Sequence, residues 1–334
     1  MGFFKYLKGA ASNFHRQGDR PDIYIFATPR SGSTFLMELL GAQRGVKIHD
    51  EPLTVNYPES RRELGVDTWE ALTIMADREQ HYRRFFYRLG RNQVKELNRP
   101  IYRKHGRLLT NRNVFKNIHG GKDMLPWFAE TFGAMIVVLI RHPIPTVLSH
   151  RKFPRLPYLL KQPGHRQLFS DQEIAFAEDI IAHGSKLEQG MVDWTLEMCA
   201  MFRNPPPNVT VISYEDLTVH PEASFAWLRE RLLLDPIDNI ASLTAQPSVS
   251  TGQSDDETRN FFAKAGPDAD RTYLISRWTQ RVVPEDIRRA FEICGFFGLH
   301  LYEDGNLFPT DAYRIPTLRP AELGAGAVLA SGKV

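Results

Sequence analysis

Residues 27–34, Ala-Thr-Pro-Arg-Ser-Gly-Ser-Thr, have the side chains and the setting to bind a phosphate-like anion. They follow a short apolar run that starts at Ile23 and precede a segment with the apolar spacing of a helix. Successive backbone N–H groups in such a loop, together with a helix N-terminus, form a cradle for an anion. Gly32 permits close approach of the backbone. Further hydrogen-bond donors come from Arg30, Ser31, Ser33 and Thr34. The alternative is a polar helix cap that only turns the chain.

This loop differs from the nucleotide-triphosphate loop G-x-x-x-x-G-K-[ST] at two positions. Ala27 stands for the first Gly, and Ser33 stands for the Lys that reaches the β- and γ-phosphates. An enzyme that uses ATP would be handicapped without that Lys, whereas a donor with a single 5′-phosphate bearing a sulfate would not need it. A nucleotide or metabolite kinase with a degenerate loop, dependent on ATP and magnesium, stays open as an alternative.

A second anion site is indicated after the apolar run from Met135 to Ile140. The run ends at Arg141-His142-Pro143, and Ser149 stands eight residues after the Arg. Arg141 can bind a phosphate in bidentate fashion, and Ser149 on the following helix faces the same way. The plain alternative is an exposed arginine at the end of a strand.

These motifs resemble those of the PAPS-dependent sulfotransferase superfamily. Residues 29–36, PRSGSTFL, are similar to its 5′-phosphosulfate loop, in the form found in tyrosylprotein, carbohydrate and bacterial enzymes. The Arg141 segment with Ser149 resembles the 3′-phosphate motif of the family. The resemblance covers residues 23 to 300 in patches. It implies the donor 3′-phosphoadenosine 5′-phosphosulfate (PAPS) as co-substrate, with no metal, and places Phe35 in the donor loop.

Two later segments resemble the family more weakly. Ser213 to Leu217 is similar to the Tyr-Glu-Asp-Leu stretch, which implies that Tyr214 contacts the donor near its adenine. A half-buried strand tyrosine is the alternative. Arg271, which precedes Trp278, resembles a C-terminal Arg…Trp element and implies a contact with the 3′-phosphate. The Arg-Lys-Gly context usual for that arginine is absent.

Sulfuryl transfer needs a base for the acceptor proton and a cation near the leaving oxygen. The resemblance implies Glu51 as the general base, in His-Asp-Glu-Pro, and Lys116 as the cation that stabilises the transition state. His119 is the rival base, because aryl and steroid enzymes use a histidine two residues after a strand-end lysine. Here the histidine stands three residues after Lys116. Glu51 could also be a helix-capping acid before Pro52.

The motifs lie where a parallel sheet would bring them together. Apolar runs separated by helical segments predict an α/β fold with a central parallel sheet flanked by helices. The resemblance implies the P-loop nucleotide-binding-like form of this fold that sulfotransferases have. Ligands on such sheets bind beyond the carboxyl ends of the strands. Strands are predicted at 23–27, 46–48, 114–118, 135–140 and 209–213. Helices are predicted at 33–40, 124–131, 144–151, 171–203, 221–234 and 284–294.

One domain is predicted, at residues 21–304. Residues 1–20 are expected to be a loose basic arm, 235–272 a long connection, and 305–334 a flexible tail. Residues 53–110 and 151–166 are basic and aromatic, and they are expected to surround the acceptor, although a solvated helix face over an apolar one is the alternative.

The composition excludes several classes of protein. The chain has 334 residues and a formal charge of +3, without the clustered excess of a nucleic-acid-binding protein. The two cysteines, Cys199 and Cys294, have no metal-type spacing, and they favour a cytoplasmic protein without disulfides. The longest apolar run is far shorter than a membrane span.

The sequence therefore predicts a sulfotransferase that moves a sulfuryl group from PAPS to a hydroxyl or amine of a small-molecule acceptor by in-line displacement. A homodimer stays open. A catalytically inactive nucleotide-binding relative is a further alternative to the kinase.

Overall fold

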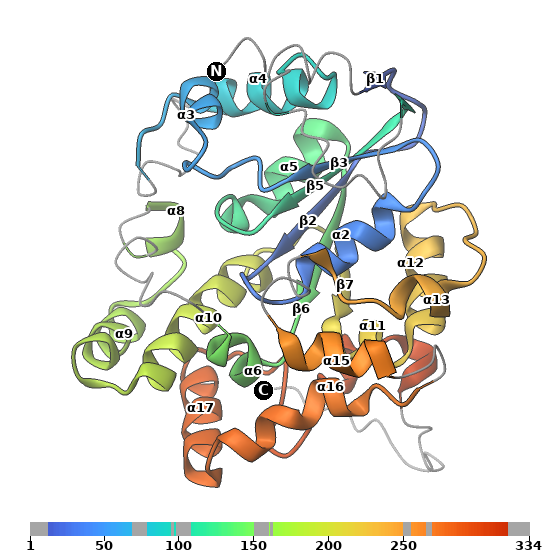
Figure 1. Ribbon diagram of the computed structural model, residues 1–334. Coiled ribbons are helices and arrows are strands. Elements are labelled where there is room, and N and C mark those ends of the chain that lie inside the picture. The colour runs from blue at the N-terminus through green and yellow to red at the C-terminus, as the bar shows by residue number, and fades with distance from the viewer. Residues whose placement is uncertain are drawn as a thin grey trace, which may run out of the picture.

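The computed structural model describes residues 13–68, 79–94, 97, 108–149, 160, 163–249, 255–264 and 269–319. Its centre is a five-stranded sheet in the order β3-β5-β2-β6-β7, in which all neighbouring strands are parallel (Figure 1). The strands are β2 (Ile23–Ala27), β3 (Val46–Asp50), β5 (Arg112–Asn117), β6 (Met135–Ile140) and β7 (Thr210–Ser213). The predicted α/β fold with a central parallel sheet is confirmed.

The central strand β2 is apolar and buried on both faces because helices cover both sides of the sheet. Tyr24 and Phe26 of β2 pack into one core, and Ile23 and Ile25 pack into the other. The alternation follows from the two-residue period of a strand. The first core is covered by α3 (Pro58–Leu64), α4 (Glu79–Gly90), α5 (Leu125–Phe132), α6 (Pro143–Leu148), α9 (Asp171–His183), α10 (Lys186–Phe202) and α17 (Pro284–Phe296). The second is covered by α2 (Ser33–Gly41), α11 (Tyr214–Val219), α12 (Pro221–Leu232) and α13 (Ile240–Thr244).

The order of the strands creates a switch point at β2. The chain passes from β2 to β3 and β5 on one side, and then crosses to β6 and β7 on the other. Loops that leave in opposite directions from neighbouring strand ends open a crevice there. The short helices α15 (Asp256–Lys264) and α16 (Thr272–Ser276) lie below the carboxyl ends of the strands (Figure 1). Residues of both helices line a cleft at this edge of the sheet.

Several predicted elements differ from the observed ones at their ends or in their number. The predicted helix 171–203 is two helices, α9 and α10, because Ser185 begins a new helix with a capping box to Glu188. Strand β3 continues to Asp50, so that Glu51 follows the strand end directly. The connection 235–272 contains the helices α13 and α15, which the polar composition of this segment did not indicate.

Both predicted flexible ends are packed where the structure describes them. In the expected arm, β1 (Phe14–His15) pairs in parallel with β4 (Leu109–Thr110). In the expected tail, Ile315 is 3% exposed and Arg314 forms an ion pair with Asp216 at 3.1 Å. The segment 305–319 includes the 3-10 helices η5 (Asp311–Tyr313) and η6 (Pro316–Leu318). A buried apolar anchor and an ion pair to a fully buried carboxylate fix this part of the chain.

Within the described ranges, no helix combines the length and the apolar character that crossing a bilayer requires.

Candidate active site

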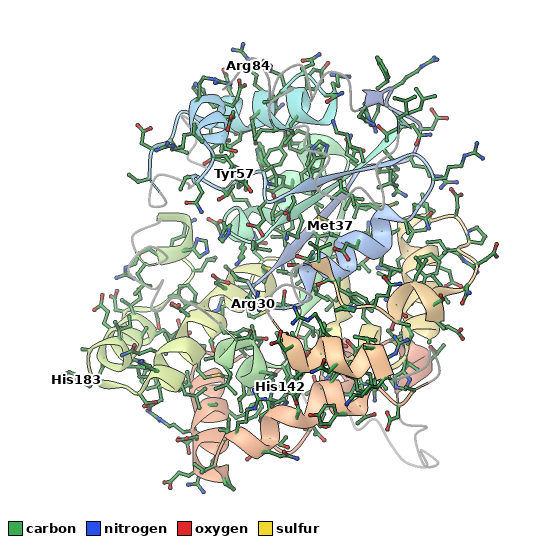
Figure 2. The ribbon with its side chains drawn as sticks, viewed as in Figure 1. Arg30, Met37, Tyr57, Arg84, His142 and His183 are labelled. Carbon is green, nitrogen blue, oxygen red and sulfur yellow. The ribbon has the colours of Figure 1, made fainter. Side chains whose placement is uncertain are left out.

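A cleft of about 710 Å³ opens at the carboxyl ends of the strands. It joins the β2–α2 loop, the ends of β5 and β6, the start of α11 and the helices α15 and α16. Figure 2 shows Arg30 at the centre of the molecule, between the sheet and these helices, and far from Arg84 on α4. The predicted site residues that line it are Arg30, Gly32, Ser33, Thr34, Phe35, Glu51, Lys116, Arg141, Ser149, Tyr214 and Arg271.

The β2–α2 loop is built to place backbone N–H groups at the start of α2. Gly32 is the N-cap residue and has a φ of 91°, which favours glycine. A Cβ there would lie 2.3 Å from Cδ2 of Tyr214, so the ring of Tyr214 also requires this glycine. Ser31 is fully buried, and its hydroxyl donates to the carbonyl of Thr28 at 2.6 Å. Ser31 therefore closes the turn of the loop.

The loop and the arginine after β6 are in direct contact. Nη1 of Arg141 donates to the backbone carbonyl of Arg30 at 2.8 Å. The guanidinium of Arg141 also lies over the ring of Tyr214, 4.2 Å from its centroid. The two predicted anion sites thus form one assembly, because β2, β6 and β7 are neighbours in the sheet and their loops meet at one edge.

A second assembly surrounds Lys116 near the end of β5. This lysine is 2% exposed, and its Nζ lies 2.5 Å from Oδ1 of Asp50 and 3.0 Å from Oε1 of Glu51. It also donates to Oγ1 of Thr34 at 3.1 Å. Burial alone would lower the pKa of Lys116, but the two carboxylates outweigh burial and raise it. A charged lysine is therefore held between the donor loop and the carboxylate of Glu51.

Glu51, which contacts Lys116 through one oxygen, contacts His119 through the other. Oε2 of Glu51 lies 3.2 Å from Nε2 of His119. Burial would raise the pKa of Glu51, but the hydrogen bond from His119 and the charge of Lys116 lower it to about 2. Glu51 lines the cleft, whereas His119 is absent from its lining. The sequence left both residues open as the base, and the structure puts Glu51 between the cleft and His119.

Two residues that line the cleft have strained backbone. Among the described residues, only five other than glycine have positive φ, and Arg30 and Glu51 are two of them, at 66° and 50°. The left-handed conformation costs a non-glycine residue about 1 kcal/mol, and it persists where the surrounding structure holds it. Such residues cluster at functional sites.

Ser149 and Arg271 line the cleft with their polar groups engaged by the protein. The hydroxyl of Ser149 donates to the carbonyl of Thr146 at 2.8 Å. Nη1 of Arg271 donates to Oγ1 of Thr244 at 2.9 Å, and Nη2 donates to the carbonyl of Ala241 at 3.2 Å. Arg271 thus stabilises α13 at the wall of the cleft through these hydrogen bonds.

The same wall contains a cationic group that was not predicted from the sequence. Arg277 lines the cleft and forms ion pairs with Asp255 at 2.5 Å and Glu257 at 3.2 Å. Burial lowers the pKa of Arg277, but the hydrogen bond and charge of Asp255 raise it overall. Its position directly before Trp278, in the predicted Arg…Trp element, is the signal that could have identified it.

A family model settles the relationship of the chain to known proteins. The model described as the sulfotransferase family matches residues 21–238, which include both predicted anion-binding motifs. The chain belongs to the sulfotransferase family. Curated protein sequences contain no match to it.

Solved structures with a similar course of the chain are also sulfotransferases. A sulfotransferase domain from the curacin biosynthetic pathway is 15% identical, covers 86% of this chain and 100% of its own, and gives a TM-score of 0.45. Mouse sulfotransferase SULT7A1, complexed with PAP, is 16% identical, with coverages of 88% and 89% and a TM-score of 0.42. The sulfotransferase domain of the Synechococcus PCC 7002 olefin synthase is 14% identical, with coverages of 86% and 97% and a TM-score of 0.45.

The predicted acceptor segments of this sulfotransferase are described only in part. Phe85 and Phe86 of α4 are 1% exposed and belong to the core, while Arg83 and Arg84 are exposed on the surface. This is the pattern of a solvated helix over an apolar face. In the second segment, residues 151–159 lie outside the described residues.

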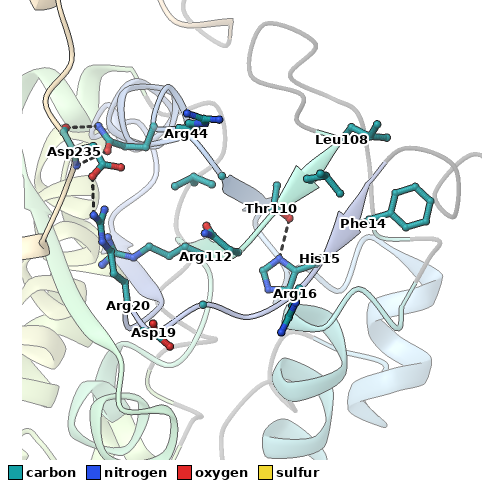
Figure 3. Close-up of a pocket in the computed structure, with 16 residues that line it drawn as sticks. Phe14, His15, Arg16, Asp19, Arg20, Arg44, Leu108, Thr110, Arg112 and Asp235 are labelled. Atoms are coloured by element: carbon teal, nitrogen blue, oxygen red, sulfur yellow. Dashed lines mark hydrogen bonds and ion pairs between the residues drawn. The ribbon is translucent and has the colours of Figure 1, made fainter.

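A larger hollow, of about 940 Å³, lies at the opposite ends of the strands (Figure 3). Here Arg112 is 4% exposed and donates to the carbonyls of Pro21, Leu232 and Leu233 at 2.7, 2.8 and 3.2 Å. Arg20 pairs with Asp235 at 2.7 Å. None of the site residues predicted for the sulfotransferase lines this hollow.

Proposed function

We propose that the chain transfers a sulfuryl group from PAPS to a hydroxyl or amine of a small-molecule acceptor, with Glu51 as the general base. The observation that supports this most strongly is that one cleft joins the β2–α2 loop, Arg141 and the Lys116–Glu51 pair. A donor with phosphate groups at two ends needs two cationic sites within one cleft. A base and a buried cation stand beside the loop that would hold the reacting end.

The donor loop would hold the 5′-phosphosulfate. The N-terminus of α2, with Gly32 as its cap, offers backbone N–H groups and the positive end of the helix dipole. Arg30 adds a cation from the same loop. At the other end, Arg141 would bind the 3′-phosphate, together with Ser149 once its hydroxyl turns from Thr146. The face of Tyr214 lies beside both sites, where the adenine would reach it.

Transfer itself is an in-line displacement at sulfur. The acceptor oxygen or nitrogen forms a bond to sulfur while the bond from sulfur to the bridging oxygen breaks, and the leaving group is adenosine 3′,5′-bisphosphate. Negative charge grows on the bridging oxygen, and Lys116 is the cation placed to neutralise it. Glu51 takes the proton that the acceptor loses.

The contacts of Glu51 explain how a carboxylate with a low pKa could serve as the base. In the free protein the pKa of Glu51 is held at about 2, largely by His119 and Lys116. When Lys116 turns toward the bridging oxygen, Glu51 loses that stabilising charge and its basicity increases. His119, on the second oxygen of Glu51, orients the carboxylate.

The proposal is tested by titrating the full chain with adenosine 3′,5′-bisphosphate and, separately, with ATP and magnesium, using calorimetry. The bisphosphate is expected to bind and ATP is not, because the loop lacks the lysine that ATP requires. Tight binding of ATP alone would contradict the proposal. Labelled PAPS and a panel of alcohols, phenols and amines then test turnover, and binding without transfer to any acceptor would indicate an inactive relative.

A further inference from the structure

The turn after β7 connects the parts of the donor cleft. Its first residue, Ser213, accepts a hydrogen bond from the backbone N–H of Asp216 at 2.9 Å, which fixes the start of α11. Tyr214 then packs against Gly32 of the donor loop and beneath Arg141. One tyrosine thus touches both anion sites. The two acids that follow it take no part in the proposed transfer.

Glu215 binds the turn from which Arg141 projects. It is 1% exposed, and its Oε1 accepts the backbone N–H of His142 at 2.9 Å. Its Oε2 accepts the hydroxyl of Tyr302 at 2.7 Å, from the segment after α17. A buried carboxyl that accepts from two separate chain segments fixes their distance, because leaving either donor unpaired would be costly. The backbone at His142 is therefore tied to α11.

Several charged groups surround this carboxyl. Arg141 lies on the turn that Glu215 binds, and Tyr302 faces it from the C-terminal segment. Asp216 is its neighbour on α11 and pairs with Arg314 at 3.1 Å. Burial raises the pKa of Glu215 to about 7, against the lowering effect of its hydrogen bonds and of Arg141. The group can therefore change charge near neutral pH, next to an arginine of the donor cleft.

We propose that Glu215 is a positioning residue: its carboxyl group fixes the backbone that carries Arg141 and thereby sets the spacing of the two anion sites in the donor cleft. Arg141 is attached on one side to the donor loop, through the carbonyl of Arg30, and on the other to α11, through Glu215 and the backbone of His142. This inference rests on the proposed function, because it takes Arg141 as a donor ligand.

The test compares binding of adenosine 3′,5′-bisphosphate to the full chain and to three variants. Glu215→Gln keeps an acceptor for the His142 N–H and resembles the neutral acid, so its dissociation constant at pH 6 should stay within about twofold of the unaltered protein. Glu215→Ala leaves the His142 N–H unpaired, and we expect binding to weaken about tenfold. Tyr302→Phe removes one of the two donors, and a smaller loss is expected.

Asp216→Asn is the matched control. Asp216 is buried on the same turn but faces Arg314 and not the Arg141 turn. This variant should lower the melting temperature without changing the dissociation constant by more than about twofold. If Glu215→Ala and Asp216→Asn weaken binding equally, Glu215 is only a structural residue of the turn and the inference is wrong.

Measuring bisphosphate binding at several pH values distinguishes an effect of Glu215 on the Arg141 site from a general loss of folded protein. Because ionised Glu215 adds negative charge beside Arg141, binding to the unaltered protein should weaken between pH 6 and 8 relative to Glu215→Gln, by up to about tenfold. Taking the ratio to Glu215→Gln cancels the titration of the ligand itself. Parallel profiles together with unchanged binding in Glu215→Ala would overturn the inference. If even the unaltered protein fails to bind the bisphosphate, the proposed function fails; if it binds and Glu215→Ala binds equally well, only this inference fails.

Discussion

The two ends of the sheet each contain a hollow lined by arginines, and they use those arginines differently. In the hollow at the amino ends of the strands, the guanidinium of Arg112 donates to three backbone carbonyls and is almost fully buried. In the cleft at the carboxyl ends, Arg141 donates once, to the carbonyl of Arg30. Within the described part of the chain, its buried Nε has no hydrogen-bond partner.

The difference shows that the larger hollow is not the better candidate for a ligand site. Native structures satisfy nearly all buried donors, so the unpaired Nε of Arg141 at the cleft supports the proposed donor site there. Arg112, by contrast, holds β5 against the segments before β2 and after α12. The strained backbone of Arg30 and Glu51 belongs to the cleft, whereas neither residue lines the hollow.

The largest expected effect is on catalysis. Glu51→Gln should lower kcat by about 10²–10⁴, because it removes a general base but keeps the size of the side chain. Steady-state kinetics with PAPS and an active acceptor measure this. Arg44→Gln, in the hollow, is the control and should leave kcat unchanged. The assignment reverses if Glu51→Gln keeps full activity while His119→Ala loses it.

The next effect separates the two arginines. Arg141→Ala should weaken binding of adenosine 3′,5′-bisphosphate by about 10- to 100-fold, since a charge-assisted hydrogen bond contributes about 1.5–3 kcal/mol. Arg112→Ala should instead lower the free energy of unfolding by about 3 kcal/mol, because it leaves buried carbonyls unpaired. Calorimetry and denaturant titration distinguish the two results. Weaker ligand binding in Arg112→Ala, in protein that is still folded, would contradict the comparison.

The pH dependence of stability should reveal the ionised Glu51. Its pKa in the folded protein, about 2, lies below the ordinary value of 4.5. Its stabilising contribution is therefore complete above pH 4.5 and is lost as the pH falls toward 2. In total, the ionised Glu51 contributes about 3 kcal/mol to the free energy of unfolding. Glu51→Gln should lack this acid loss in denaturant titrations from pH 6 downward. Asp235→Asn, at an exposed ion pair of the hollow, should change the profile far less. Identical profiles for Glu51→Gln and the unaltered protein would refute the Glu51 contacts.

A smaller effect is expected from two glycines with positive φ. Gly32→Ala should reduce stability by about 1–2 kcal/mol and also weaken bisphosphate binding about tenfold, since the new Cβ would displace Tyr214. Gly45→Ala, in the hollow, meets Oδ1 of Asn111 at 2.5 Å with a φ of +76°. It should reduce stability by a similar amount while ligand binding stays unchanged. Equal losses of binding in both variants would mean that the effect is global.

The smallest effect concerns the exposed ion pair of the hollow. Arg20 and Asp235 have side chains that are 48% and 46% exposed. Arg20→Gln should therefore change the free energy of unfolding by no more than about 0.5 kcal/mol. Thermal and denaturant unfolding provide the check. A loss of several kcal/mol would show that Arg20 contributes to the hollow in the way that Arg112 does.

The sequence determined the parts of the fold that local patterns encode. Short runs with apolar and β-branched residues predicted all five strands of the central sheet, and β2 and β6, which are buried on both faces, have the most continuous apolar runs. The run ending at Arg141 and the loop from Ala27 to Thr34 predicted two anion sites without any tertiary information, and the structure places both segments in one cleft. Helix ends and the helices within residues 235–272 were missed, since their apolar contacts are made to distant segments.

Tertiary structure alone decided how the site residues pair. No spacing along the chain reveals that Arg141 contacts the carbonyl of Arg30, or that Glu51 lies between Lys116 and His119. These contacts arise because parallel strands bring together loops that are distant in sequence, and burial then favours ion pairs and hydrogen bonds between their charged groups. The sequence supplied the chemical groups, and the order of the strands determined which of them meet.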